Sequence, residues 1–212
     1  MMPALAALLV AVDVGHYAAE PGVISASGMP EFAFNLALAH EVKAELEKFP
    51  IKVRLIGERG DYAVLHHRTR DAQGADLFVS IHHDSVKERL LPQADRFSGF
   101  SLFVSKFNPF SDQSLACASL MGKRLRENGF SPSRYHADPV LGENRPFADE
   151  ENGVHYFDNL AVAGRSAPMA SVLVEAGVIV NRDEEKRMRD PEVRRRLAAA
   201  MAAGVRDCLA RE

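Results

Sequence analysis

Residues 7–16 read Ala-Leu-Leu-Val-Ala-Val-Asp-Val-Gly-His, and this stretch decides the fold class. Its apolar part, from Ala7 to Val12, is typical of a strand buried on both faces of a parallel sheet. Gly15 permits the sharp backbone turn with which such a strand leaves the sheet. His16 is therefore expected at the carboxyl end of the strand, where open α/β sheets place their binding sites.

A second apolar run ends in the same way. Residues 75–81 read Ala-Asp-Leu-Phe-Val-Ser-Ile and lead directly into His82 and His83. Because adjacent residues of a strand point to opposite faces, only one of these two histidines can share a crevice with His16. The residues alone leave that choice open. Two strands that each deliver a histidine at their end indicate a shared metal site.

Two glutamates extend this pattern. Glu31 follows Pro30, which suits the first turn of a helix, and Glu175 ends a third apolar run at residues 171–174. Two histidines and one carboxylate, with one coordination position left open, are the ligands of a catalytic zinc site. Taken singly, a histidine at a strand end is more often an ordinary polar residue than a ligand. The convergence of four positions on one crevice favours a metal hydrolase.

These segments resemble the zinc-dependent N-acetylmuramoyl-L-alanine amidases of the amidase-3 family, in the family's order and from about residue 8 to 210. The matching motifs are Asp-x-Gly-His at 13–16, the glutamate at the start of the first helix (Glu31), Leu-x-x-Arg at 65–68, Ala-Asp-Leu-Phe-x-Ser-Ile-His at 75–82, and Leu-Val-Glu-x-Gly at 173–177. The chain departs from the family pattern at Tyr17-Ala18-Ala19, where Gly-Gly is usual, at Gln73 and Asp84, where Asn is usual, and at Val178, where Phe is usual.

The resemblance implies that His16, Glu31 and His82 bind a zinc ion and that Glu175 is the general acid and base. It implies hydrolysis of the amide bond between N-acetylmuramic acid and L-alanine, with peptidoglycan or a muropeptide as substrate. A protein activator is a possible further partner, and the expected location is the periplasm or cell envelope. Two alternatives stay open: a zinc peptidase acting within the stem peptides, and a catalytically silent peptidoglycan-binding domain of the same fold.

The alternation of strands and helices predicts a single α/β domain with a mainly parallel, twisted sheet of about six strands and helices on both faces. A chain of 212 residues can bury one such core, and we expect the amidase-3-like catalytic domain to span residues 7–212. Residues 1–6 form an apolar leader, either the remnant of a signal peptide or a short lead into the first strand. A net charge of -3 gives no reason to expect nucleic acid, and no apolar run is long enough for a membrane span.

Four further expectations concern particular residues and segments. Residues 129–165 are expected to be irregular, and residues 183–211 to form a single closing helix. Arg68 is interpreted as a structural anchor that pairs with a carboxylate, with substrate contact as the alternative. Cys117 and Cys208 fall in separate helical patterns, and we expect them to be buried free thiols that pair only if the fold brings the two helices together.

Overall fold

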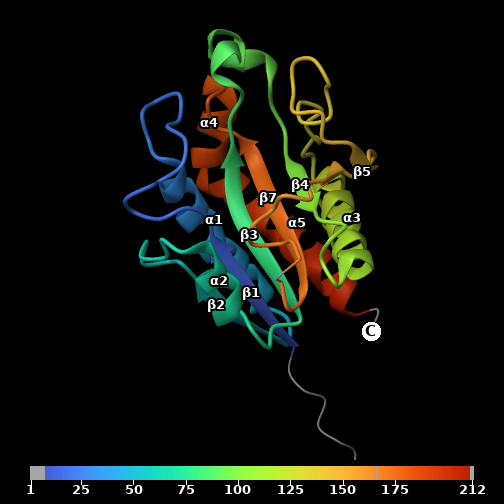
Figure 1. Ribbon diagram of the computed structural model, residues 1–212. Coiled ribbons are helices and arrows are strands. Elements are labelled where there is room, and N and C mark those ends of the chain that lie inside the picture. The colour runs from blue at the N-terminus through green and yellow to red at the C-terminus, as the bar shows by residue number, and fades with distance from the viewer. Residues whose placement is uncertain (1–7, 166, 211–212) are drawn as a thin grey trace, which may run out of the picture.

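The computed structural model of the protein describes residues 8–165 and 167–210, so the expected leader at residues 1–6 lies outside the described residues. Within these ranges, one sheet has the strand order β2-β1-β3-β7-β4-β6-β5 (Figure 1). The strands are β1 (Leu8–Val14), β2 (Ile51–Ile56), β3 (Leu77–Asp84), β4 (Ser101–Val104), β5 (Phe147–Asp149), β6 (Val154–Tyr156) and β7 (Ala170–Val178).

Most neighbouring strands of this sheet are parallel. The pairs β1–β2, β1–β3, β3–β7 and β4–β6 are parallel, whereas β4–β7 and β5–β6 are antiparallel. The expected single α/β domain with a mainly parallel sheet is therefore confirmed, with seven described strands instead of about six. The extra strand is part of a short β5–β6 hairpin inside residues 129–165, which were expected to be irregular.

Helices cover both faces of the sheet, but unequally. The helices are α1 (Glu31–Leu46), α2 (Leu65–Asp71), α3 (Ser111–Glu127), α4 (Arg182–Arg189) and α5 (Pro191–Leu209), and a 3-10 segment covers Glu88–Arg96. The long helices α1, α3 and α5 pack on one face over the largest apolar core (Figure 1). The other face has a smaller core, to which the end of α2 and the segment before β7 contribute. No helix in the described part of the chain combines the length and the apolar composition needed to cross a membrane.

The central strands bring the predicted site residues to one edge of the sheet. β1, β3 and β7 lie side by side, and nearly all of their residues are buried. The parallel register pairs His82 with Glu175 and Val14 with Ile81. Because parallel strands end at the same edge, the end of β1 meets the ends of β3 and β7 there.

The closing helix is broken, so the prediction of one continuous helix is wrong. α4 ends at Arg189 and α5 begins at Pro191, with Asp190 between them in an extended conformation. The Asp190 side chain accepts hydrogen bonds from the backbone N–H groups of Glu192 (2.8 Å) and Val193 (3.4 Å). Proline at the first helical position supplies no N–H and disfavours a helical conformation in the residue before it, so a new, capped helix starts here.

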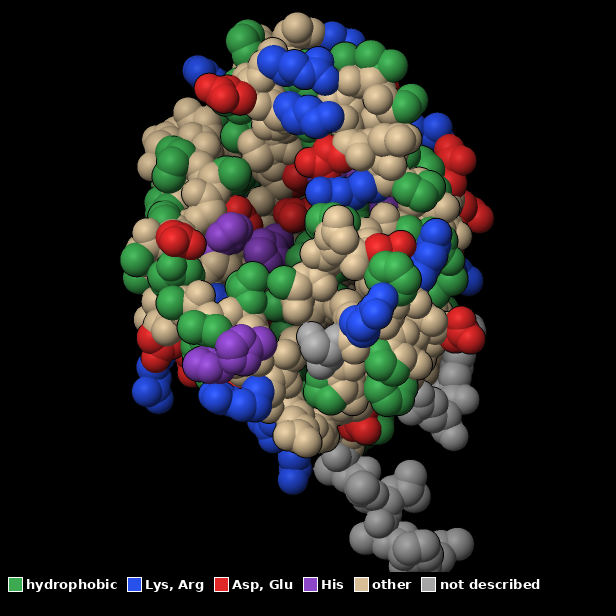
Figure 2. All heavy atoms as spheres, viewed as in Figure 1, with side chains coloured by type: hydrophobic (Ala, Val, Ile, Leu, Met, Phe, Trp, Pro, Cys, Tyr) green, Lys and Arg blue, Asp and Glu red, His purple; other side chains and the backbone are tan. Residues whose placement is uncertain are grey.

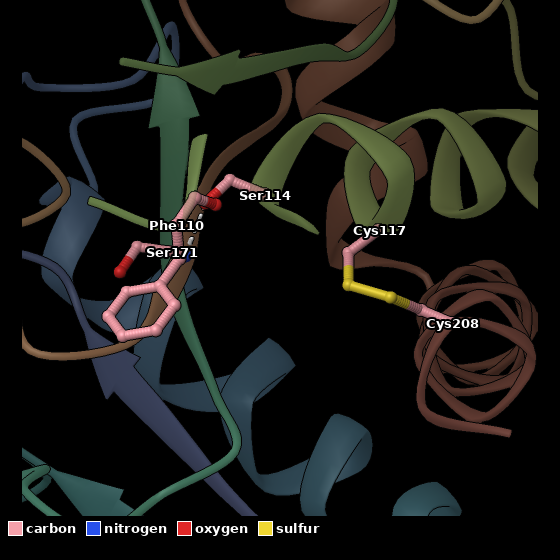
Figure 3. The surroundings of a disulfide bond; sticks show 5 residues. All are labelled: Phe110, Ser114, Cys117, Ser171 and Cys208. Atoms are coloured by element: carbon pink, nitrogen blue, oxygen red, sulfur yellow. Dashed lines mark hydrogen bonds between the residues drawn. A yellow bond between two sulfur atoms is a disulfide. The ribbon is translucent and has the colours of Figure 1, made fainter. Parts of the chain in front are cut away.

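The two cysteines form a disulfide, so the prediction of free thiols is also wrong. Cys117 of α3 and Cys208 of α5 are joined with a Cα–Cα distance of 5.0 Å (Figure 3). Both are buried, because α3 and α5 pack against each other on the same face of the sheet. The first turn of α3 is also tied to the sheet: the Ser114 hydroxyl donates to the Phe110 carbonyl (2.8 Å) and accepts from the Ser171 N–H (2.9 Å).

Candidate metal centre and active site

Three of the predicted site residues meet at the carboxyl edge of the sheet. His16 follows β1, Glu31 opens α1, and His82 lies near the end of β3. The Nε2 atom of His16 lies 3.0 Å from Glu31 Oε2, and Nδ1 of His82 lies 3.1 Å from Glu31 Oε1. The candidate ligand atoms of the three residues all lie within 4.8 Å of one another. Two imidazoles and one carboxylate on converging elements form a donor set that suits zinc.

Two glycines make room for this cluster. A Cβ atom on Gly15 would lie 2.4 Å from the His82 ring, so a side chain there would displace the imidazole. Gly22 has a φ of +81°, which favours glycine, and its Cβ would lie 2.3 Å from Glu31 Oε2. His16 itself has a positive φ of 66°, an uncommon conformation for a residue with a side chain. The turn after β1 is therefore shaped around the three side chains.

The Glu31 carboxylate is fixed by its surroundings. It accepts hydrogen bonds from the backbone N–H of Val23 (3.2 Å), from the backbone N–H of His83 (3.1 Å) and from the side-chain amide of Asn35 (3.0 Å). Burial by itself would raise the pKa of Glu31, but the hydrogen bonds with His16 and His82 outweigh it and hold this pKa well below its usual value. Asn35 was not predicted, although its position four residues after Glu31 on one helix face is a readable signal.

The structure shows which of the two adjacent histidines, His82 or His83, belongs to the candidate metal cluster. His83 is buried, and its Nδ1 atom lies 2.8 Å from the side-chain oxygen of Asn35, away from the cluster. Burial lowers the pKa of His83 to about 4, so this ring is neutral at physiological pH. His82 is thus the member of the pair that joins His16 and Glu31, in agreement with the motif.

Arg68 is a structural anchor, as expected. Its side chain is 1% exposed, and its guanidinium donates to Asp13 Oδ1 (2.7 Å) and to the Val14 carbonyl (2.5 Å). The second oxygen of Asp13 accepts a hydrogen bond from the Ser80 hydroxyl (2.6 Å). Asp13, the aspartate of the Asp-x-Gly-His motif on β1, therefore links this strand to Arg68 of α2 and to Ser80 of β3.

Glu175 faces the cluster from β7. Its Oε2 atom is buried and has no hydrogen-bond partner among the described residues. Burial raises the pKa of Glu175 well above its usual value, and the nearby carboxylates of Asp84 and Glu31 raise it further. A carboxyl group with one buried, unpartnered oxygen and a raised pKa has the properties required of a proton-transfer group.

Two cavities meet at His16 and His82. One, of about 490 Å³, is lined mainly by polar and charged side chains, including Glu31, Glu143 and Glu175. The other, of about 390 Å³, has a largely apolar wall formed by Ala63, Leu65, Leu160, Ala161, Val162 and Leu173. Figure 2 shows histidine side chains (purple) and acidic side chains (red) gathered in a hollow on this face of the molecule. The site is thus a groove with a polar and an apolar half.

Glu143, which lines the polar half, and the two residues that contact it, His136 and Arg145, were not predicted from the sequence. His136 is buried, and its ring nitrogens lie 2.7 Å from Asp84 Oδ2 and 2.8 Å from Glu143 Oε2. The two carboxylates outweigh the effect of burial and raise the pKa of His136 to about 9. Arg145 donates to the same Glu143 oxygen (2.8 Å). The length of the connection at residues 129–165 was the only sequence signal for them.

The fold and this centre together define an α/β protein with a His-Glu-His metal-binding arrangement beside a carboxyl group that has one buried, unpartnered oxygen. Residues 10–207 match the family model described as N-acetylmuramoyl-L-alanine amidase, Amidase_3. The match covers most of the chain, and the chain belongs to this family.

Individual relatives agree with the family assignment. The chain is 27% identical to the probable N-acetylmuramoyl-L-alanine amidase AmiB of Haemophilus influenzae, over 94% of this chain but 52% of that protein, so it spans about half the length of that relative. It is 27% identical to AmiA of Escherichia coli, over 93% of this chain and 74% of that protein. The catalytic domain of CwlV from Bacillus (Paenibacillus) polymyxa superimposes with a TM-score of 0.75 at 26% identity, covering 97% of this chain and 99% of that one. Ami1 of Mycobacterium smegmatis shares the fold, with a TM-score of 0.78 at 22% identity, 98% coverage of this chain and 99% coverage of that one.

Proposed function

We propose that this chain is a zinc-dependent N-acetylmuramoyl-L-alanine amidase, which hydrolyses the amide bond between N-acetylmuramic acid and L-alanine in peptidoglycan. The observation that carries the proposal is the convergence of His16, Glu31 and His82 beside the buried, unpartnered carboxyl oxygen of Glu175. Membership of the amidase family supplies the reaction class, and the four side chains supply the groups that such a reaction needs.

The donor set supports zinc as the metal. His16, Glu31 and His82 would hold it, because two imidazoles and a carboxylate are a common catalytic zinc set and leave one position open. When bound there, zinc supplies Lewis-acid polarisation of the scissile carbonyl and lowers the pKa of a water molecule to about 7. The Asn35 amide and the Val23 N–H orient the glutamate ligand, so the cluster needs little rearrangement to accept a cation.

Glu175 is proposed as the group that moves the proton. As a carboxylate it would take a proton from the attacking water, and as a carboxylic acid it would pass that proton to the departing amine of L-alanine. Its raised pKa suits both steps, because it makes the carboxylate a stronger base toward the attacking water and helps the acid form to persist until it donates to the amine. The Oε2 atom makes no hydrogen bond to the described residues, so no such bond has to be broken in either step.

We also propose an extracytoplasmic location, in the periplasm or cell envelope, and a catalytic domain that covers residues 7–212. The Cys117–Cys208 disulfide supports the location, because such bonds persist in oxidising compartments and are rare in the cytosol. The substrate would be peptidoglycan or a muropeptide. A protein activator fits the same proposal as a possible partner.

Metal analysis of three variants tests the ligand assignment. Wild-type protein purified in the presence of zinc should contain one zinc ion per chain. His16→Ala and His82→Ala should abolish zinc binding, whereas His83→Ala, a matched change one residue along the strand, should retain it. Zinc retained by His82→Ala and lost from His83→Ala would contradict the assignment.

Mass analysis of digested muropeptides tests the reaction. The amidase releases an intact stem peptide that begins with L-alanine and leaves N-acetylmuramic acid with a free lactyl carboxylate. Cleavage within the stem would instead identify a zinc peptidase. Zinc-loaded protein that binds muropeptides and leaves them intact would identify a silent binding domain.

A further inference from the structure

Glu143 is an active-site carboxylate that accepts hydrogen bonds from side chains on only one of its two oxygens among the described residues. Both of its hydrogen bonds fall on Oε2: from His136 Nδ1 at 2.8 Å and from Arg145 Nη1 at 2.8 Å. The side chain remains 28% exposed and lines the polar cavity together with Glu31 and Glu175. A carboxylate has further acceptor positions beyond those that two donors occupy. The Glu143 carboxylate can therefore accept further hydrogen bonds from a ligand in the groove, at a position that His136 and Arg145 define.

The two residues that hold Glu143 are themselves fixed. The His136 ring is 4% exposed, and its other nitrogen contacts Asp84 at the end of β3 (2.7 Å). The Arg145 guanidinium lies 3.6 Å from the centre of the Phe157 ring, in stacking distance. The pKa of His136 is raised to about 9, so His136 is a cation at neutral pH and balances the carboxylates on its two sides.

The same segment is also hydrogen-bonded to two residues that follow β3, Lys87 and Arg89. The Tyr135 hydroxyl accepts a hydrogen bond from the backbone N–H of Lys87 (2.9 Å), and the Lys87 ammonium donates to the Gly142 carbonyl. Arg89 donates to the Val140 carbonyl (2.8 Å). Residues 135–145 are thus hydrogen-bonded to the chain that follows β3, and Tyr135 and Glu143 of this segment line the polar cavity.

The position of Glu175 indicates which way round the substrate lies in the groove. In amide hydrolysis the group that donates the final proton must lie beside the departing amine, and in this substrate that amine belongs to the stem peptide. Glu175 lines the polar cavity and is absent from the lining of the apolar one. The stem peptide should therefore leave through the polar half, and the N-acetylmuramoyl part should lie over the apolar half, where Leu160 and Val162 can pack against its methyl groups and sugar face.

We propose that Glu143 binds the stem peptide by accepting hydrogen bonds from its N–H groups on the leaving side of the groove, and that His136 and Arg145 are positioning residues for this contact. The proposal rests on the proposed amidase function and adds a specificity-determining residue to it. A stem peptide carries backbone N–H donors at regular spacing, which match an acceptor that is charged, fixed and partly exposed. In this orientation the N-acetylmuramoyl half would lie over the apolar cavity, which Glu143 does not line.

Equilibrium binding of the two product halves tests the proposal. Free stem tetrapeptide and N-acetylmuramic acid are titrated separately, by calorimetry, into the zinc-loaded chain and into zinc-loaded Glu143→Gln. The variant keeps the size of the side chain, but its amide can satisfy His136 and Arg145 only by turning its oxygen toward them, which leaves an NH2 donor facing the peptide. We expect the Kd of the tetrapeptide to rise by about ten-fold or more, because the lost bond is to a charged acceptor. The Kd of N-acetylmuramic acid should be unchanged.

Kinetics on a muramoyl-tetrapeptide give the second readout. Glu143→Gln should raise KM by a similar factor with little change in kcat, because the lost contact lies outside the reacting bond. Glu151→Gln, at a 72% exposed glutamate paired with Arg126, is the matched control and should change neither constant. His136→Gln should raise KM in the same direction as Glu143→Gln; a purely structural role for His136 would lower stability and leave the tetrapeptide Kd of the folded variant unchanged.

Several results would overturn the proposal. An unchanged tetrapeptide Kd would show that Glu143 does not contact the stem peptide. A rise in the Kd of N-acetylmuramic acid alone would show that the substrate lies in the opposite direction along the groove. A fall in kcat with constant KM would show that Glu143 takes part in the reaction itself. If Glu143→Gln does not fold, Glu143→Asp, which keeps the charge on a shorter side chain, is used in the same comparison. A wild-type chain that releases no tetrapeptide contradicts the proposed function, whereas the binding comparison still decides the role of Glu143.

Discussion

Removing the Cys117–Cys208 disulfide should destabilise the protein strongly while leaving its site intact. The bond links positions that are 91 residues apart, so it restricts a large part of the unfolded chain. Chain-entropy estimates for a loop of this length give about 4–5 kcal/mol of stabilisation at 25 °C. For a domain of this size, a loss of that order lowers Tm by about 10 °C.

The assay is equilibrium unfolding in guanidinium chloride at 25 °C, with thermal unfolding as a second measure. Oxidised wild type is compared with the Cys117→Ala/Cys208→Ala double variant and with wild type under reducing conditions. Alanine is chosen because both cysteines are buried, and serine would add unpaired hydroxyl groups to the α3–α5 interface. Zinc content of the folded double variant should equal that of wild type, because the metal-binding cluster lies at the strand ends and not between these helices.

The reasoning would be refuted by either of two results. Thiol titration of unfolded, unreduced protein could find two free thiols, in which case the bond does not form. Alternatively, the double variant and the reduced protein could both lie within about 1 kcal/mol of the oxidised wild type, which would show that the loop constraint contributes little to the stability.

Three further changes test the parts of the site separately. Arg68→Met should lower the free energy of unfolding by about 3–5 kcal/mol, because it leaves the buried Asp13 carboxylate unpaired; a loss below about 1 kcal/mol in denaturant titrations would argue against the anchor. Gly22→Ala should weaken zinc binding in competition with a chelator, since its Cβ would lie 2.3 Å from Glu31 Oε2, and unchanged zinc affinity would contradict the crowding argument. The pKa of His136 is raised from 6.5 to about 9 in the folded protein, so its stabilising effect is complete below about pH 6.5 and is lost as the pH rises through 9. The stability difference between wild type and His136→Gln should therefore shrink by about 3 kcal/mol between pH 6.5 and pH 10, and a difference that is constant with pH would disprove the charge assignment.

The sequence was a good guide wherever one short segment decides its own structure. The apolar runs before His16 and His82 predicted two neighbouring buried strands, because both faces of a parallel sheet must be apolar. The spacing of Phe34, Leu38, Val42 and Leu46 at intervals of four residues likewise indicates the buried face of α1. Since strands that end together bring their last residues together, the metal-binding cluster could be anticipated from the same segments.

The features that were missed depend on contacts between distant segments. The Cys117–Cys208 bond requires that α3 and α5 pack side by side, which helical periodicity alone does not show. The pairing of His136 with Asp84 joins positions 52 residues apart, inside a connection with no regular pattern. The break before Pro191 is different, because an aspartate followed by proline is a helix-start signal that the local sequence itself carries.

The central claim is that Glu175 transfers the proton in a zinc-dependent cleavage of the bond between N-acetylmuramic acid and L-alanine. The most direct measurement is turnover of a purified muropeptide by wild type and Glu175→Gln, with products identified by mass and zinc measured on the same samples. The account predicts that wild type releases the intact stem peptide, and that Glu175→Gln keeps one zinc per chain while kcat falls by about 10²–10⁴-fold. Near-native turnover by zinc-loaded Glu175→Gln, or cleavage at any other bond, would contradict it.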